Sequence, residues 1–155
     1  MDLFPRNGIR PPSYDYAAYK REYKAYADAL APLTPGPRLR GGTWCTPDWL
    51  KDWAGYMSDF GGGMNSAAFH RYPESKCHGS TPTLEGLMAE AATAGVAAAT
   101  APLAAAANKA GVAFHIGEGN SVSCGGAAGV SDVFGSALWA VDVLFSMSVI
   151  NVTRW

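Results

Sequence analysis

One order of signals runs along the 155-residue chain: a short run of strand-forming residues, a turn, and then a helical pattern. We predict strands over residues 39–44, 66–72, 112–117 and 148–152, and helices over residues 13–30, 46–57, 81–109 and 133–145. Strands that alternate with helices pair in parallel and are joined by right-handed crossovers. The sequence therefore predicts an α/β fold with a parallel sheet, in one domain that spans residues 1–155.

Local signals mark where these helices begin and bend. Tyrosines at steps of three and four define one face of the first helix, for which Ser13 is the predicted N-cap. Thr46, followed by Pro47 and Asp48, predicts the start of the second helix. Gly95 and Pro102 predict a kink in the long Ala-rich helix, or its division into two pieces.

Length, charge and hydropathy exclude several classes of protein. A complete (β/α)8 barrel needs roughly 250 residues, so 155 residues exclude one. A net charge of -1 offers no basic surface for a nucleic acid. Residues 1–6 show no secretory signal. The longest apolar stretch, residues 133–152, holds Asp142 near its centre, so we interpret it as buried in the protein and expect no membrane contact.

Residues that carry chemistry are expected where the parallel strands end, because all the strand-to-helix loops meet at that edge of the sheet. Three pairs of side chains stand there: Trp44 with Cys45, His70 with Tyr72, and Glu118 with Asn120. Glu118 is the only acid that ends an otherwise apolar strand, which is typical of a catalytic carboxylate and also of a solvated loop acid.

His70 and Tyr72 alternate onto the same face of their strand, so they could project together beside Glu118. An imidazole or a phenol that donates a hydrogen bond would orient a nucleophilic carboxylate and keep it ionised. The alternative is that these two side chains only pack at the end of the strand.

The cysteines and histidines give weaker signals. Cys77 and Cys124 follow neighbouring strands and are the best candidates for a disulfide, although two free thiols would fit the sequence as well. A metal site is disfavoured because its candidate ligands lack the short fixed spacings of zinc sites; these are His70, Cys77, His78, His115 and Cys124. The glycines around Glu118 match neither the dinucleotide pattern nor the P-loop pattern, so we expect no cofactor.

Taken together, several motifs resemble glycoside hydrolase family 79, the β-glucuronidase and heparanase family, and its fungal members in particular. The motifs are His70-Arg71-Tyr72-Pro73, the run from Glu118 to Gly126, Gly129-Val130-Ser131-Asp132, and Ser136 to Asp142. An acid, a Gly-rich loop, Val-Ser-Asp and an aromatic-bearing helix stand in the family's order, and the resemblance covers the whole chain.

The resemblance implies a fold and a reaction. The family's catalytic domain is a (β/α)8 TIM barrel followed by a β-sandwich, and this chain would supply about four β/α units, the second half of the barrel, without the sandwich. The family hydrolyses β-glucuronide-type glycosides with retention, using two carboxylates roughly 5 Å apart. Glu118 matches the nucleophile, supported by His70 and Tyr72, and Trp44 and Asn120 are expected to bind the sugar.

The second carboxylate in the family belongs to an Asn-Glu-Pro motif. Residues 2–4 and 8–14 resemble the family's residues on the carboxyl side of that motif, so Met1 stands where its proline would be. We therefore expect residues 1–155 to lack the acid/base and to be inactive alone. The alternatives are a non-catalytic carbohydrate-binding or interaction protein and a truncated gene product. The family is extracellular, and half a barrel would expose sheet edges through which copies could self-associate.

Overall fold

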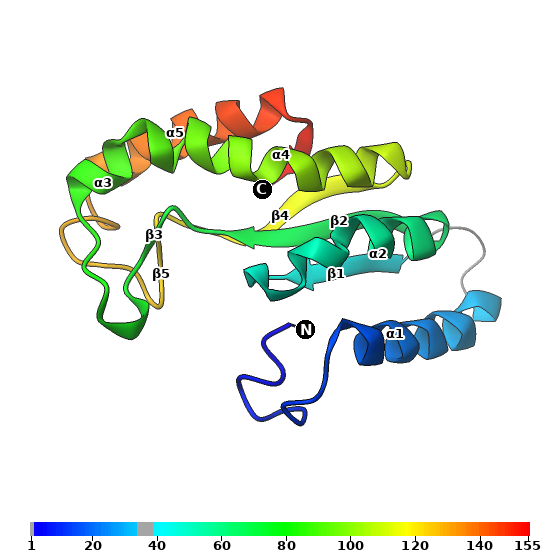
Figure 1. Cartoon of the computed structure of the whole chain (residues 1–155). Coiled ribbons are helices and arrows are strands. Elements are labelled where there is room, and N and C mark those ends of the chain that lie inside the picture. Colours follow the sequence, from blue (N-terminus) through cyan, green and yellow to red (C-terminus); the bar gives the residue numbers. More distant parts are fainter. Residues whose placement is uncertain (1, 34–38) are drawn as a thin grey trace.

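The computed structural model describes residues 2–33 and 39–155, and in it a four-stranded parallel sheet organises the chain. The spatial order is β1-β2-β4-β6, and the strands are β1 (Leu39–Trp44), β2 (Met64–Arg71), β4 (Ala113–Gly119) and β6 (Val152–Arg154). Two short strands, β3 (Glu74–Ser75) and β5 (Val122–Ser123), pair in parallel beyond the carboxyl ends of β2 and β4 (Figure 1).

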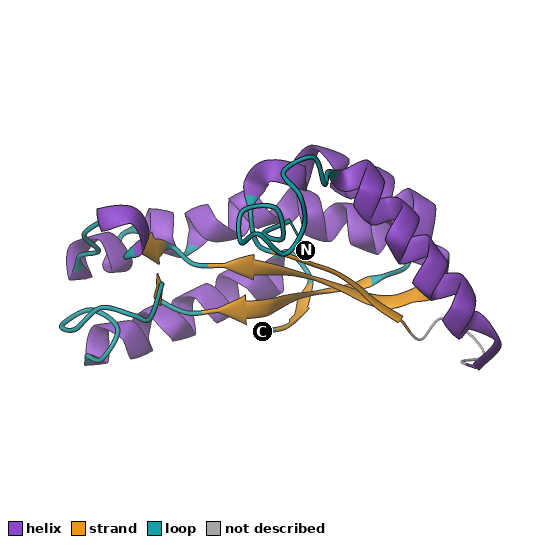
Figure 2. Cartoon of the chain, turned by 90° about the horizontal axis from the view of Figure 1, so that it is seen from below, coloured by secondary structure: helices purple, strands orange, loops and turns teal. Residues whose placement is uncertain are grey.

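The described residues form five α-helices and several 3-10 turns, of which α1 precedes the first strand and the others lie between strands. The helices are α1 (Tyr16–Leu30), α2 (Trp53–Phe60), α3 (Leu84–Met88), α4 (Ala94–Lys109) and α5 (Phe134–Val149). They form a layer that curves around the strands (Figure 2). The strands of the four-stranded sheet follow one another in chain order with a helix between neighbours, so the predicted α/β fold is confirmed and corresponds to part of a TIM-like barrel.

Two of the predicted helix boundaries are wrong. Asp15 caps α1 in place of Ser13, because its carboxylate accepts a hydrogen bond from the Ala18 N–H at 2.9 Å. The long Ala-rich helix divides at residues 89–93 and not at Gly95 or Pro102. The indole of Trp139 donates to the carbonyl of Ala92 at 2.8 Å, which gives one of the carbonyls at the break a partner.

The last helix is longer than predicted, and the last strand is correspondingly shorter. The α5 helix continues to Val149, and Asn151 then takes a left-handed backbone conformation with φ of 63° before β6 begins at Val152. The expectation that this apolar stretch is buried is only half right. Trp139, Val143 and Met147 are buried, whereas Phe145 and Val149 on the other side of α5 are largely exposed. None of the described helices is long and apolar enough to cross a membrane.

The face of the sheet that packs against the helices carries an aromatic core, and we call it the covered face. Phe69, Phe114 and Ile116 point from the strands into this core. The indole of Trp53 donates to the carbonyl of Leu103 at 3.1 Å, which joins α2 to α4. The core is completed by Trp44 of β1, by Trp49 of the 3-10 turn that precedes α2, and by side chains of α1 and α2 that include Tyr19, Tyr56 and Met57.

The opposite face of the sheet, which we call the open face, carries small and polar side chains. The ladder places Thr43 beside Ala68 and Ala68 beside His115. Arg40 lies two rungs earlier, beside Ser66. Because alternate residues of a strand point to opposite sides, these residues share the face that the aromatic core does not occupy.

Candidate active site

A β-bulge turns Glu118 toward the open face. In β2 and β4, Phe69 pairs with Ile116, but the next residue, His70, pairs with Glu118, so Gly117 is an extra residue in the ladder. Strict alternation from Ile116 would send the Glu118 side chain into the covered face. The bulge shifts the alternation by one residue and places Glu118 beside His70.

Two side chains from the end of β2 meet the Glu118 carboxylate. The phenol of Tyr72 donates a hydrogen bond to Oε1, and the His70 Nδ1 lies 3.8 Å from Oε2. Burial, followed by the hydrogen bond to Glu118, raises the pKa of Tyr72 to about 12. The phenol is therefore protonated at neutral pH and can donate a hydrogen bond to the carboxylate. The Glu118 side chain is 60% exposed, and the imidazole of His70 is 18% exposed. The carboxylate is therefore oriented by its neighbours and still accessible to a ligand.

The two glycines that flank Glu118 allow close packing at this edge. A Cβ on Gly117 would lie 3.0 Å from the Cβ of Ala68, and a Cβ on Gly119 would lie 2.6 Å from the ring of Trp155. Larger residues at these positions would push β4 away from β2 or displace the indole. Trp155 was not among the predicted site residues, because a residue beyond the last strand has no pattern that links it to Glu118.

The loops that follow β2 and β4 are tied together beyond the site. Glu74 pairs with Val122 and Ser75 with Ser123 in the β3-β5 ladder, and the hydroxyl of Ser123 donates to that of Ser75 at 3.0 Å. A disulfide joins Cys77 to Cys124, whose Cα atoms lie 5.6 Å apart. These connections hold the segment that carries Tyr72 beside the segment that carries Glu118.

Asp2 fastens the amino-terminal segment to the same edge of the sheet. Its carboxylate, which is buried, accepts hydrogen bonds from the Thr46 N–H at 2.6 Å and the Thr46 hydroxyl at 2.7 Å. It also accepts from the Cys45 N–H at 3.1 Å and from the Cys45 thiol at 3.4 Å. Burial, then Asp2, and then Glu118 raise the pKa of the Cys45 thiol to about 12. The thiol is therefore protonated at neutral pH and is a poor nucleophile.

Trp44 and Asn120, the two expected sugar-binding residues, differ in exposure, because Trp44 is buried and Asn120 is exposed in the loop after β4. Trp44 is fully buried in the covered-face core, edge-on to the ring of Trp53 at 5.1 Å between centroids. The amide oxygen of Asn120 accepts from the N–H of Ser121 at 2.7 Å and so shapes its own loop. The described residues contain no group of three or more His, Cys, Asp or Glu side chains that could hold a metal ion.

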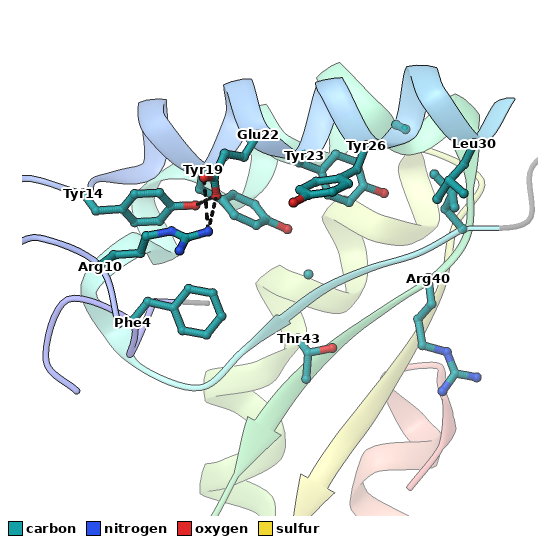
Figure 3. A pocket seen from close by; sticks show the side chains of 13 residues that line it. Phe4, Arg10, Tyr14, Tyr19, Glu22, Tyr23, Tyr26, Leu30, Arg40 and Thr43 are labelled. Carbon is teal, nitrogen blue, oxygen red and sulfur yellow. Dashed lines mark hydrogen bonds and ion pairs between the residues drawn. The ribbon is translucent and has the colours of Figure 1, made fainter. Parts of the chain in front are cut away.

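An aromatic hollow of about 310 Å³ lies apart from Glu118, between α1 and the β1 strand (Figure 3). Tyr23 and Tyr26 line one side, and Phe4 lies across from them. The guanidinium of Arg10 and the phenol of Tyr14 both donate to the Glu22 carboxylate here. The carboxylate that lines this hollow, Glu22, is already paired with Arg10, so it is not free to act as Glu118 could.

The comparisons with known proteins give matches among solved structures alone. No profile of a known protein family matches the chain, and no curated protein sequence matches it. Among solved structures, a 4-O-α-L-rhamnosyl-β-D-glucuronidase from Fusarium oxysporum 12S, determined as a Rha-GlcA complex, is similar with a TM-score of 0.76 and 25% sequence identity. The match covers 90% of this chain and 30% of the enzyme.

This similarity supports a relation to fungal glucuronidases and a glycoside-hydrolase-like fold, because the match extends over nearly the whole chain. The chain spans less than a third of the enzyme's length. The shared part is a partial TIM-like barrel, and in this chain the Tyr72–Glu118 pair lies at the carboxyl edge of its strands.

Proposed function

We propose that this chain carries the nucleophile side of a retaining, β-glucuronidase-like glycoside hydrolase site, with Glu118 as the nucleophile. The observation that carries the proposal is the bulge at Gly117, which turns an exposed carboxylate to the open face at the end of a parallel strand. Active sites of TIM-like barrels lie at this end of the strands. The similarity to a fungal glucuronidase supports the choice of substrate class.

The two neighbours of Glu118 fit the needs of a nucleophile. A retaining glycosidase attacks the anomeric carbon with one carboxylate oxygen, so the other oxygen must be held in place. Tyr72 donates to Oε1, which leaves Oε2 as the oxygen for attack. The imidazole of His70, 3.8 Å from Oε2, is close enough to contact a sugar hydroxyl or the ring oxygen beside that oxygen.

The second carboxylate would come from outside residues 2–155. Asp2 anchors the amino-terminal segment at the carboxyl end of β1, on the same edge as Glu118. The resemblance to family 79 places the acid/base just before this segment, so a carboxylate there would reach the site. Without it, the proton for the leaving group must come from solvent, at a cost typically of 10²- to 10⁴-fold in rate.

An experiment with two leaving groups tests this assignment on the 155-residue chain. 2,4-Dinitrophenyl β-glucuronide needs no leaving-group protonation, and methyl β-glucuronide does. We expect release of dinitrophenol and no measurable release of methanol, and added azide should give the β-glucuronosyl azide. Release of dinitrophenol at the same rate by a folded Glu118→Gln variant would overturn the assignment.

A second candidate function is carbohydrate binding without chemistry. The exposed Tyr72–Glu118 edge favours it, because aromatic and carboxylate side chains also bind sugar hydroxyls in non-catalytic proteins. Calorimetric titration with methyl β-glucuronide separates the two functions. Saturable binding that Glu118→Gln leaves unchanged, together with no reaction of the dinitrophenyl substrate, would establish the binding protein in place of the enzyme.

A further inference from the structure

A second polar group lies on the open face, near the amino-terminal ends of the strands and away from Glu118. It surrounds a hollow of about 490 Å³, and its charged members are Arg40 and Arg154. The described residues that line the hollow, none of them acidic, are Arg40, Asn65, Ser66, Ala113, His115, Thr153 and Arg154. Ser66 and Ala113, which pair with each other beside Arg40, are small and leave room for the hollow.

The sheet ladder explains how the cationic groups come together. His115 of β4 pairs with Arg154 of β6, so the two side chains are neighbours on one rung. Arg40 of β1 lies two rungs before, beside Ser66, which in turn pairs with Ala113. Side chains two residues apart in a strand point to the same face, so Arg40 and His115 both face the hollow.

His115 is the most unusual member of this group. It is only 5% exposed, and neither of its ring nitrogens has a hydrogen-bond partner. Burial, followed by the charges of Arg40 and Arg154, lowers the pKa of His115, so the ring is neutral at pH 7. Buried polar atoms are nearly always hydrogen-bonded in native proteins, so the ring nitrogens of His115, which lie beside a polar hollow, are available to bind a group that enters it.

We propose that Arg40, His115 and Arg154 form a binding site for a carboxylate. Neither guanidinium is ion-paired with a described residue, and each can donate two parallel hydrogen bonds to the two oxygens of a carboxylate. The N–H of neutral His115 supplies a further donor from the floor of the hollow. The bound charge also offsets the repulsion between two arginines that face the same small volume.

The carboxylate has two possible sources, a free small acid or an aspartate or glutamate side chain of another polypeptide that packs on the open face. Both place the same two oxygens between the arginines, so the chemistry of the site is shared. In a solution of the pure protein, another polypeptide can only be a second copy of this chain. Binding of a second copy depends on protein concentration, and binding of a free acid depends on the acid concentration, so the two sources can be distinguished.

NMR of the histidine ring protons tests the site on the 155-residue chain. Sodium acetate and sodium malonate are titrated against sodium chloride at equal ionic strength. We expect saturable shifts of the His115 ring signals with the carboxylates and not with chloride, while the signals of His70 and His78 stay nearly unchanged. A dependence of the His115 signals on protein concentration without added acid would identify a second copy as the source.

Variants make the test specific to the two arginines. We expect Arg40→Gln and Arg154→Gln each to weaken malonate binding about tenfold, and Arg154→Lys to restore part of it. Arg21→Gln, an exposed change on α1, is the matched control and should leave binding unchanged. The proposal is overturned if the wild-type His115 signals show no saturable carboxylate shift, or if the two arginine variants bind malonate as the wild type does.

Discussion

The two faces of the sheet differ in what they contain and in what their residues require. On the covered face, Phe69 and Phe114 lie in an aromatic core, and the Trp53 indole has a hydrogen-bond partner. On the open face the side chains are small or charged, and the ring nitrogens of His115 have no partner. The covered face is filled by side chains of the described residues, although the Trp44 indole nitrogen and the hydroxyls of Tyr16 and Tyr23 also lack partners there, whereas the polar side chains of the open face line a hollow.

One strand can contribute to the core and to the candidate site when a single bulge interrupts the alternation of its side chains between the two faces. In β4, Phe114 and Ile116 contribute to the core, and after the bulge at Gly117 the same strand presents Glu118 to the open face. The apolar core therefore lies on one side of the sheet and the candidate site on the other. Substitutions on the two sides should have separable effects on folding and on reactivity.

The largest expected effect on stability is a core truncation on the covered face. Phe69 is 1% exposed, so Phe69→Ala should lower the free energy of unfolding by about 3–5 kcal/mol. Thr43→Ala, an exposed change at the neighbouring rung of the open face, should change it by less than about 0.5 kcal/mol. Urea denaturation measures both, and equal losses would remove the distinction between the faces.

The disulfide beyond the site should matter nearly as much. Its cysteines are 47 residues apart in sequence, and closing a loop of that size typically stabilises a protein by about 2–4 kcal/mol. We expect the double variant Cys77→Ser, Cys124→Ser to lose that amount in urea denaturation under non-reducing conditions. Cys45→Ser is the control, because Cys45 is a free thiol. If the double variant is as stable as the control, the two loops are not held by this bond.

A smaller effect is expected from the phenol that orients the candidate nucleophile. Tyr72→Phe removes the hydrogen bond to Glu118 Oε1 and leaves the ring in place. A hydrogen bond to a charged group is worth about 1.5–3 kcal/mol, and the lower end applies to an exposed carboxylate. We therefore expect about a tenfold slower release of dinitrophenol from the activated glucuronide, with unchanged thermal stability. An unchanged rate would show that Tyr72 only packs at the strand end.

The smallest expected effect is a loss of stability at alkaline pH through Cys45. Its thiol has a pKa of about 12 in the folded chain against 9.0 ordinarily, so above pH 9 the folded state holds more protons than the unfolded state. The stability it contributes is present below pH 9 and is lost as the pH rises toward 12. Because the thiol is only partly buried, we expect a loss of about 0.5–1 kcal/mol between pH 8 and pH 10.

Urea denaturation at pH 8 and pH 10 measures this change, and Cys45→Ser is the informative comparison. The hydroxyl of serine does not ionise in this range, so the variant should lose less stability than the wild type over the same interval. An equal loss in both proteins would mean that other groups, among them the buried tyrosines, account for the whole pH dependence.

Much of the framework could be predicted from the order of sequence signals. The parallel pairing of β2 and β4 follows from apolar runs bounded by glycine and proline, and the extent of β1 from the proline before it and the helix cap after it. The placement of Tyr72 near Glu118 also follows, since neighbouring parallel strands end at one edge. These features depend on local residues and on general rules of sheet topology.

The remaining features depend on contacts between distant residues. Trp44 looked like a binding residue because it ends a strand, but its ring is enclosed by side chains of α1 and α2 that no local pattern connects to it. The anchoring role of Asp2 needs the loop at Thr46, 44 residues away. The bulge at Gly117 is also hidden in sequence, because it is visible only when β4 is paired with β2.

Covalent trapping of the nucleophile tests the central claim most directly. The folded chain, verified by circular dichroism, is incubated with 2-deoxy-2-fluoro-β-glucuronosyl fluoride and analysed by intact mass and peptide mapping. We predict one glycosyl adduct per chain, located on Glu118, with no adduct on Glu118→Gln and normal labelling of the exposed control Glu90→Gln. A folded wild-type chain that remains unlabelled, or that is labelled at another residue, would contradict the assignment of Glu118 as the nucleophile.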